Sequence, residues 1–263
     1  FLLGGTAGRT TLAGEGLQHQ DGHSHLLAST IPNCVSYDPA FGYELAVIIQ
    51  SGMKRMFQNQ ENIFFYITVM NENYTHPPMP EDVQEQILSG MYLFKSQTDA
   101  NIQLMGSGAI LREVIEAAKI LDDDYGVVAN IWSVTSFNEL RKEGLENSRW
   151  NLLNPASPKK KSFVEKQLTG HKGPCIAATD YMKAYADQIR EFVPSQYYAL
   201  GTDGYGRSDS RKQLREHFEI NSTFIVFTAV KALYDSGEAS IDLVNEVMER
   251  FSISNQKTNP ARD

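Results

Sequence analysis

Apolar residues in the first third of the chain fall into blocks that predict a strand, a helix and a second strand. Residues 31–37 (IPNCVSY) form a short apolar run that predicts a buried strand, and Asp38-Pro39 after it predicts a turn. From this turn to about Gln58, apolar residues recur at helical spacing, at Leu45, Ile48, Ile49, Met53 and Met56. Residues 63–69 (IFFYITV) predict the second strand, and residues 1–3 predict the end of another. A strand, helix and strand in this order indicate a βαβ unit with a parallel sheet.

The second half of the chain repeats this alternation of strands and helices about four times. An amphipathic segment covers residues 81–91, and the polar, proline- and lysine-rich residues 150–173 predict a long loop. We therefore expect a second parallel α/β layer. Strands are predicted over residues 102–105, 127–134, 174–178 and 197–201, and helices over 109–121, 137–145 and 181–192 and from about 212, 222 and 240.

The two halves are separated by the sequence His76-Pro77-Pro78-Met79-Pro80. Its three prolines in four residues fit neither a strand nor the interior of a helix. We therefore place a domain boundary here and predict an α/β protein with domains at residues 1–78 and 79–263. The chain has no initial methionine and opens inside an apolar segment, so we expect it to be a fragment of a longer protein.

The overall charge narrows the classes of partner. The chain of 263 residues has a net charge of -8 and a pI of about 5.3, which argues against nucleic acid or an anionic membrane as its main partner. No apolar run approaches the ~18 residues of a membrane-spanning helix, and we expect no signal peptide. Cys34 and Cys175 lie in strand-like segments and do not make a disulfide framework, so a reducing cytoplasm is the expected compartment.

Chemically active residues gather in residues 14–25 (GEGLQHQDGHSH). This stretch holds three of the six histidines of the chain, one glutamate and one aspartate. Histidine changes its charge near neutral pH, so it can move protons or hold an anionic substrate. The composition of the stretch leaves three interpretations open: a histidine-rich surface loop, a catalytic loop and a metal site.

Three further loops follow predicted strands, where parallel α/β sheets place their binding groups. Gly106-Ser107-Gly108 precedes a helix and could either cradle a phosphate or only make a tight turn. Residues 201–211 (GTDGYGRSDSR) lack the glycine spacing of a dinucleotide fingerprint. Their aspartates and arginines favour ion pairs across a surface between domains or subunits, with substrate contact as the alternative. Residues 71–74 favour a polar turn, with a binding role as the alternative.

Several motifs, in order along the chain, carry a resemblance to a known family. Over essentially its whole length the sequence resembles the homodimeric, bacterial-type pyruvate dehydrogenases, the decarboxylating first component of the pyruvate dehydrogenase complex. The motifs are long and ordered, so the resemblance is specific. They are GGTAGRTTLxGEGLQHxDGHSH (4–25), IPNCVSYDP (31–39), NENY (71–74), SVTSFNEL (133–140), GTDGYGRSDSR (201–211) and NPAR (259–262).

This resemblance implies an order of domains and an activity. Residues 1–78 would be the C-terminal part of a thiamine diphosphate pyrimidine-binding domain, and residues 79–263 a transketolase-like C-terminal domain. The family uses thiamine diphosphate and Mg²⁺ to decarboxylate pyruvate oxidatively and to acetylate the lipoyl group of its partner, dihydrolipoyl acetyltransferase, reductively. Its active site lies between the two subunits of a cytoplasmic homodimer.

The resemblance also implies which residues in 14–25 take part in the reaction. In the family, the glutamate and histidine of the motif GEGLQH line the active site, and they fall on Glu15 and His19. His19 would hold the carboxylate of pyruvate and relay protons. Glu15, four residues earlier, would raise the pKa of His19 if the segment turns helically. A D-G-x-x-H element of related transketolases would place His25 near the cofactor. Gln20 stands where relatives often carry glutamate.

The family's cofactor motifs are not found in this chain. Its GDG…N motif for Mg²⁺ and diphosphate, and the glutamate that activates the aminopyrimidine, belong to upstream regions. We therefore predict no cofactor-binding and no metal-binding residues here. The isolated fragment is expected to be inactive, and a non-catalytic module for dimerisation and assembly is one alternative. A related transketolase or 2-oxoglutarate dehydrogenase is another.

Overall fold

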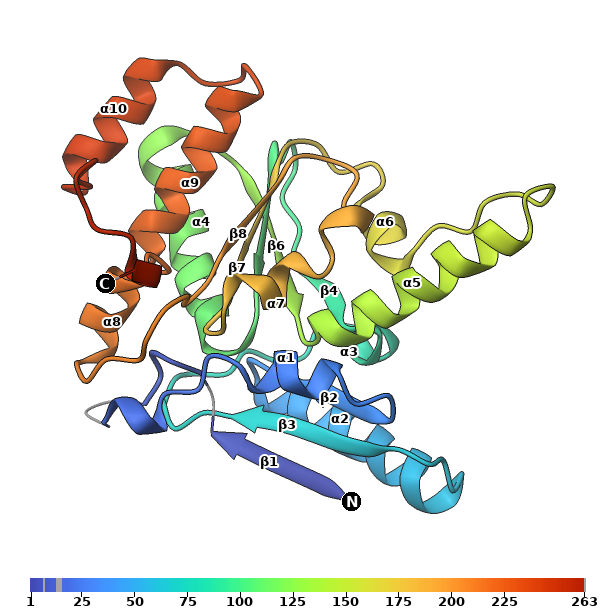
Figure 1. Ribbon diagram of the computed structural model, residues 1–263. Coiled ribbons are helices and arrows are strands. Elements are labelled where there is room, and N and C mark those ends of the chain that lie inside the picture. The colour runs from blue at the N-terminus through green and yellow to red at the C-terminus, as the bar shows by residue number, and fades with distance from the viewer. Residues whose placement is uncertain (7, 13–15, 263) are drawn as a thin grey trace.

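The strands form two sheets in a computed structural model that describes residues 1–6, 8–12 and 16–262 (Figure 1). The smaller sheet has the order β1-β3-β2, and its strands all run parallel. They are β1 (Leu2–Thr6), β2 (Cys34–Tyr37) and β3 (Phe64–Val69). Helix α2 (Gly42–Met53) joins β2 to β3 and continues as a π-helix over Lys54–Gln58. This arrangement confirms the predicted βαβ unit.

The larger sheet has the order β4-β6-β5-β7-β8. Its central strands run parallel, and β4 is an antiparallel edge strand beside β6. The predicted α/β fold class is therefore confirmed, although the sequence analysis missed β4. The predicted amphipathic segment 81–91 is helix α3 (Gln84–Ser89), which ends at Gly90 in a left-handed conformation. The strands are β4 (Met91–Lys95), β5 (Ile102–Gly106), β6 (Ala129–Val134), β7 (Cys175–Ala178) and β8 (Tyr197–Leu200).

Helices cover both faces of the larger sheet (Figure 1). Because side chains alternate along a strand, Leu104 packs in the core on one face and its neighbour Met105 in the core on the other. The first face carries α4 (Leu111–Tyr125), α8 (Arg211–His217), α9 (Ser222–Asp235) and α10 (Ile241–Arg250). The second carries α5 (Phe137–Leu153), α6 (Phe163–Leu168) and α7 (Lys183–Asp187).

Short helical turns complete the described chain. The turn Leu17–His19 and helix α1 (Ser24–Ser29) lie between β1 and β2 in the sequence. Further 3-10 turns occur at Gly108–Ile110, Arg190–Phe192 and Pro260–Arg262. Among the described helices, none has the length and apolar character needed to cross a membrane.

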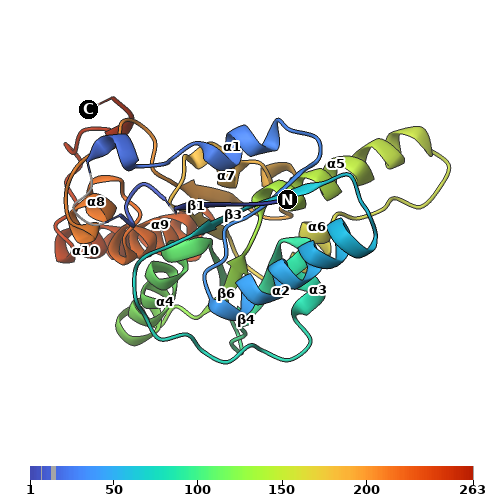
Figure 2. The same cartoon turned by 90° about the horizontal axis from the view of Figure 1, so that it is seen from below.

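The structure corrects the long loop that was predicted for residues 150–173. Helix α5 runs to Leu153, and its C-terminal half extends beyond the sheets in both views (Figures 1 and 2). Helix α6 begins after Ser162, whose hydroxyl oxygen accepts a hydrogen bond from the N–H of Glu165 (3.0 Å). This S-x-x-E pattern is a capping signal, which the neighbouring prolines and lysines obscured. The strand predicted at residues 31–37 is also shorter, because only Cys34–Tyr37 pair with β3.

The carboxyl ends of the two sheets meet, and two buried aspartates join them. Asp38, after β2, accepts hydrogen bonds from the hydroxyl groups of Thr68 (2.7 Å) and Ser107 (3.0 Å). Ser107 follows β5 in the larger sheet. Asp180, after β7, accepts hydrogen bonds from the N–H (3.0 Å) and O–H (2.6 Å) of Thr10, which lies in the loop after β1. Each aspartate therefore reaches from its own sheet to a loop of the other.

A partly buried ion-pair network strengthens the same junction. Glu72, after β3, contacts Arg215 of α8 (2.5 Å) and Arg112 of α4 (2.6 Å). Arg215 also contacts Glu113 (3.1 Å), and its side chain is only 6% exposed. A buried cation with two carboxylate partners stabilises its surroundings only while all three charges are present.

We expect the substitution Arg215→Ala to lower the free energy of unfolding by about 3–5 kcal/mol, because Glu72 and Glu113 then lose a buried counter-charge. Arg250→Ala is the control, since Arg250 pairs with Asp124 at 2.6 Å but is 45% exposed. It should cost less than about 1 kcal/mol. Unfolding in urea measures both values, and equal losses in the two variants would contradict the proposed importance of the junction.

Candidate active site

His19 lies on an exposed turn near the junction of the sheets. The turn Leu17–His19 is a single 3-10 turn in which the N–H of His19 donates to the carbonyl oxygen of Gly16 (2.9 Å). The imidazole is exposed, whereas the next residue, Gln20, is buried. Glu15, the second predicted catalytic residue, lies outside the described residues. The structure thus presents one of the two predicted side chains, in a position that a substrate can reach.

Two side chains connect this region to residues 201–211, the loop after β8. The side-chain amide of Gln20 pairs with the main chain of Arg207: the N–H of Arg207 donates to Gln20 Oε1 (2.6 Å), and Gln20 Nε2 donates to the Arg207 carbonyl oxygen. The guanidinium of Arg9 donates to the carbonyl oxygens of Thr202 (2.7 Å) and Gly204. The loop after β8 is therefore held against the segment that carries His19.

Arg9 is itself an interior residue. It is 2% exposed, and its Nη2 lies 3.3 Å from Nδ1 of His23. Burial lowers the pKa of Arg9, and the carboxylates of Asp21, Asp180 and Asp203 act in the opposite direction. Arginine begins so far above neutrality that Arg9 remains a cation and keeps its hydrogen bonds.

The three histidines of residues 14–25 occupy different environments. His19 and His23 are exposed, but His25 is fully buried and stacks on the ring of Tyr185 at a centroid distance of 4.8 Å. His25 Nε2 lies 3.0 Å from Thr68 Oγ1, which donates its own hydrogen to Asp38, so Nε2–H is the donor. Burial lowers the pKa of His25 to about 3, against the effect of Asp21, and the ring is neutral. His25 has a structural position with no surface for a ligand.

Asp21 organises the start of α1. Its Oδ1 accepts hydrogen bonds from the N–H groups of His23 and Ser24, both at 2.9 Å. Within residues 1–6, 8–12 and 16–262, no group of three or more His, Cys, Asp or Glu side chains could hold a metal ion. The metal interpretation of residues 14–25 therefore has no support in the described part of this stretch. Cys34 and Cys175 are free and buried.

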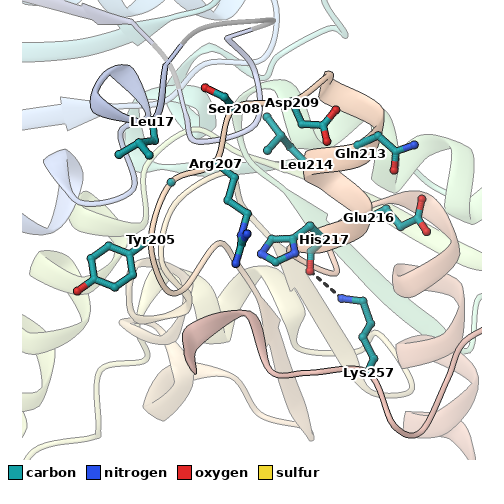
Figure 3. Close-up of a pocket in the computed structure, with 11 residues that line it drawn as sticks. Leu17, Tyr205, Arg207, Ser208, Asp209, Gln213, Leu214, Glu216, His217 and Lys257 are labelled. Atoms are coloured by element: carbon teal, nitrogen blue, oxygen red, sulfur yellow. Dashed lines mark hydrogen bonds between the residues drawn. The ribbon is translucent and has the colours of Figure 1, made fainter. Parts of the chain in front are cut away.

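A cavity of about 660 Å³ lies beside the turn that carries His19 (Figure 3). Leu17 lines it from that turn, and the side chains of Arg207 and His217 point toward one another inside it (Figure 3). Lys257 Nζ donates to the carbonyl oxygen of His217 (2.7 Å). The sequence analysis singled out neither His217 nor Lys257, because three segments far apart in the sequence form the walls and no local pattern marks them.

The loops at residues 106–108 and 71–74, which were candidates for ligand binding, make contacts that hold the fold together. The N–H of Gly108 donates to the main-chain oxygen of Asp38 (3.1 Å), and Ser107 donates to the Asp38 carboxylate. Gly108 has φ +49°, and a Cβ there would lie 2.5 Å from Asp38 Oδ2. The donors that a phosphate would need are taken by Asp38, so the interpretation as a tight turn is the supported one. In residues 71–74, Glu72 serves the ion-pair network.

Comparisons with known proteins agree with this architecture. Residues 1–77 match the family model of the pyruvate dehydrogenase E1 component middle domain, and residues 90–221 match that of the transketolase-like TK C-terminal domain. Over 99% of its length the chain is 57% identical to the pyruvate dehydrogenase E1 component of Pseudomonas aeruginosa and 48% identical to that of Escherichia coli. The chain belongs to the pyruvate dehydrogenase E1 component family.

This E1-family chain spans about 30% of the length of these two relatives. Solved transketolases share its fold. A transketolase from Pichia stipitis aligns with a TM-score of 0.66 at 16% identity, over 90% of this chain and 30% of its own. A transketolase from Campylobacter jejuni aligns with a TM-score of 0.62 at 19% identity, over 87% of this chain and 30% of its own. The predicted resemblance and fold class are thus confirmed, and the domain boundary after residue 78 stays a prediction.

The junction of the two sheets contains a carboxylic acid, Asp38, whose pKa is unusually high. Burial raises the pKa of Asp38 to about 7, although the hydroxyl groups of Thr68 and Ser107 act in the opposite direction. The nearby carboxyl groups of Asp180 and Glu44 raise it further. Neutral His25 reaches the same carboxyl group through Thr68. Desolvation is the largest effect, because the carboxyl group is entirely enclosed.

We expect Asp38 to make the stability of this chain depend on pH. Its pKa is 3.8 when solvated and about 7 when folded, so its favourable contribution is complete below about pH 4 and is lost as the pH rises to 7. Between these limits the wild type should lose on the order of 4 kcal/mol more unfolding free energy than the isosteric variant Asp38→Asn.

Asp235→Asn provides a control of the opposite sign. Hydrogen bonds from Lys231 and Tyr198 lower the pKa of Asp235, so its contribution is lost as the pH falls. Urea unfolding at several pH values measures both differences. Parallel pH curves for the wild type and Asp38→Asn would show that Asp38 does not titrate with folding.

Proposed function

We propose that this chain is part of a thiamine diphosphate-dependent pyruvate dehydrogenase E1 subunit. The whole protein would decarboxylate pyruvate oxidatively and acetylate the lipoyl group of dihydrolipoyl acetyltransferase reductively, as a cytoplasmic homodimer within the multienzyme complex. The observation that carries the proposal is the sequence identity of 48–57% to two proteins named pyruvate dehydrogenase E1 component, over nearly the whole chain. An exposed histidine on an anchored turn supports it.

The described residues offer no cluster of side chains for the Mg²⁺ ion of such an enzyme. Mg²⁺ requires several oxygen ligands, and no cluster of three or more acidic, histidine or cysteine side chains exists in the described ranges. The donors of Ser107 and Gly108, at a strand end, are engaged by Asp38. We therefore propose that thiamine diphosphate and Mg²⁺ are held by the remainder of the longer protein, and that this chain contributes side chains to the substrate.

His19 is the side chain that we propose acts on pyruvate. A protonated imidazole can donate a hydrogen bond to the carboxylate of pyruvate and balance its charge. The same ring can then give or take a proton while the substrate remains bound. Both roles require a side chain that is exposed and held at one place, and His19 combines an exposed ring with a neighbour, Gln20, that is buried and hydrogen-bonded. Glu15 is proposed to assist it.

In the full-length enzyme, we expect His19→Ala to lower kcat/KM for pyruvate by roughly 10²- to 10⁴-fold, the range for loss of a proton-transfer group. His171→Ala is the control, since His171 contacts Asn130 (3.1 Å) just before β7, at the opposite end of the strand from Asp180. It should retain its activity. Steady-state assays with pyruvate measure both variants, and wild-type turnover by His19→Ala would remove His19 from the mechanism.

The isolated chain offers a separate test. Because its described residues offer no cluster for Mg²⁺, we expect no decarboxylation of pyruvate when thiamine diphosphate and Mg²⁺ are added to it. The full-length enzyme, assayed beside it with pyruvate and with 2-oxoglutarate, distinguishes the alternatives. Preference for 2-oxoglutarate, or transfer of two-carbon units between sugars, would contradict the proposal. Decarboxylation by the isolated chain would place the cofactor site within it.

A further inference from the structure

Gln20 is a buried polar residue directly beside the proposed catalytic histidine. It is 8% exposed, whereas its neighbours Gln18 and His19 are exposed. Both ends of its side-chain amide are used: Oε1 accepts from the N–H of Arg207 (2.6 Å), and Nε2 donates to the carbonyl oxygen of the same residue. The amide thus pairs with one residue of main chain as a neighbouring β-strand would. A buried amide so fully satisfied has a single favourable position.

Close packing restricts this pairing further. A Cβ built on Gly206 would lie 3.0 Å from Gln20 Cβ, from Gln20 Oε1 and from the carbonyl oxygen of Leu17. The loop after β8 therefore lies directly against the turn Leu17–His19. The main-chain N–H of Gln20 donates to the carbonyl oxygen of Leu17 (3.3 Å), which ties Gln20 to the same turn. A displacement of the Gln20 side chain would consequently move the turn and the imidazole of His19 with it.

The loop that receives Gln20 is itself held in place. The N–H of Thr202 donates to the carbonyl oxygen of Tyr181 (2.8 Å), and Asp203 Oδ1 accepts from the N–H of Lys183 (2.9 Å). At the far end, Arg211 Nε donates to the carbonyl oxygen of Thr11 (2.6 Å). These contacts attach residues 201–211 to the larger sheet at one end and to the loop after β1 at the other. Because residues 201–211 are fixed at both ends, they can hold the turn Leu17–His19 in one position.

We propose that Gln20 is a positioning residue, through which the loop at residues 201–211 of the C-terminal part sets the place of His19 in the active site. This inference depends on the proposed function of His19. The part of the side chain that this role needs is the oxygen that accepts from the Arg207 N–H (2.6 Å). The amide of Gln20 supplies it in this chain, and the glutamate that relatives often carry at this position can supply it as well.

The test uses the full-length enzyme with Gln20→Ala, Gln20→Glu and the control Gln188→Ala. Gln188 is a matched control because its Nε2 donates to Asn138 Oδ1 (2.7 Å) and to the Tyr185 carbonyl oxygen (3.2 Å), away from His19. We expect Gln20→Ala to lower kcat/KM for pyruvate about tenfold, and Gln188→Ala to change it by less than about twofold. The Gln20→Glu variant should stay close to wild type, because the carboxylate keeps the acceptor for the Arg207 N–H.

A double-mutant cycle separates positioning from general destabilisation. If Gln20 acts through His19, Gln20→Ala should cause no further loss in the His19→Ala background. The inference would be overturned if Gln20→Ala caused the same tenfold loss in the wild type and in His19→Ala, or no loss in the wild type. Either result would leave the proposed function intact.

Hydrogen exchange tests the pairing of Gln20 with the Arg207 main chain, here called the clamp, without any assay of activity. In a peptide covering residues 201–211, exchange at the Arg207 amide should quicken in Gln20→Ala and remain slow in Gln20→Glu, which keeps the acceptor. Unchanged exchange in Gln20→Ala would show that the clamp is absent. Full turnover by His19→Ala would instead contradict the proposed function, and with it the role of Gln20 in catalysis, whatever the exchange shows.

Discussion

The placement of one sheet against the other depends on two carboxyl groups, those of Asp38 and Asp180. Both are buried where the strand ends of the two sheets meet. Removing a carboxyl group from water is unfavourable, so each needs several donors. Asp38 takes them from Thr68 and Ser107, and Asp180 takes them from Thr10 and Thr11. In both cases at least one donor belongs to the opposite sheet. Because these bonds are directional, they allow one register between the sheets, where a purely apolar contact would tolerate sliding.

The same constraint shapes the candidate active site. Main-chain bonds and Arg9 bring the loop after β1 and the loop after β8 together around Asp180. The turn that carries His19 is then fastened to the second loop by Gln20. An exposed catalytic side chain on an otherwise free loop would sample many positions, which weakens catalysis. Here the exposed ring is flanked by a residue whose own position is determined by the interior, so exposure and order are combined.

Much of the fold follows from local patterns. The short apolar runs at β2, β3, β5, β6 and β7 predict strands, and the structure has a strand at each. Strand β4 was missed because its short apolar run directly follows helix α3 at Gly90, and the two were read as one amphipathic segment. Helix α6 was missed although Ser162 and Glu165 form its cap, since composition outweighed a local hydrogen-bonding signal. Chains in which strong local preferences agree are the ones that sequence analysis describes well.

The sequence by itself determined the α/β class and the family, and it predicted His19 as the catalytic histidine. Order of residues, more than composition, separated His19 from the other histidines. Tertiary structure alone decided that His25 is enclosed by tyrosines, that Ser107 and Gly108 bind Asp38 in place of a phosphate, and that Gln20 pairs with Arg207. The physical reason is distance along the chain. Periodicity and capping involve residues a few positions apart, whereas burial and these hydrogen bonds depend on partners up to 187 positions away, which only the folded chain brings together.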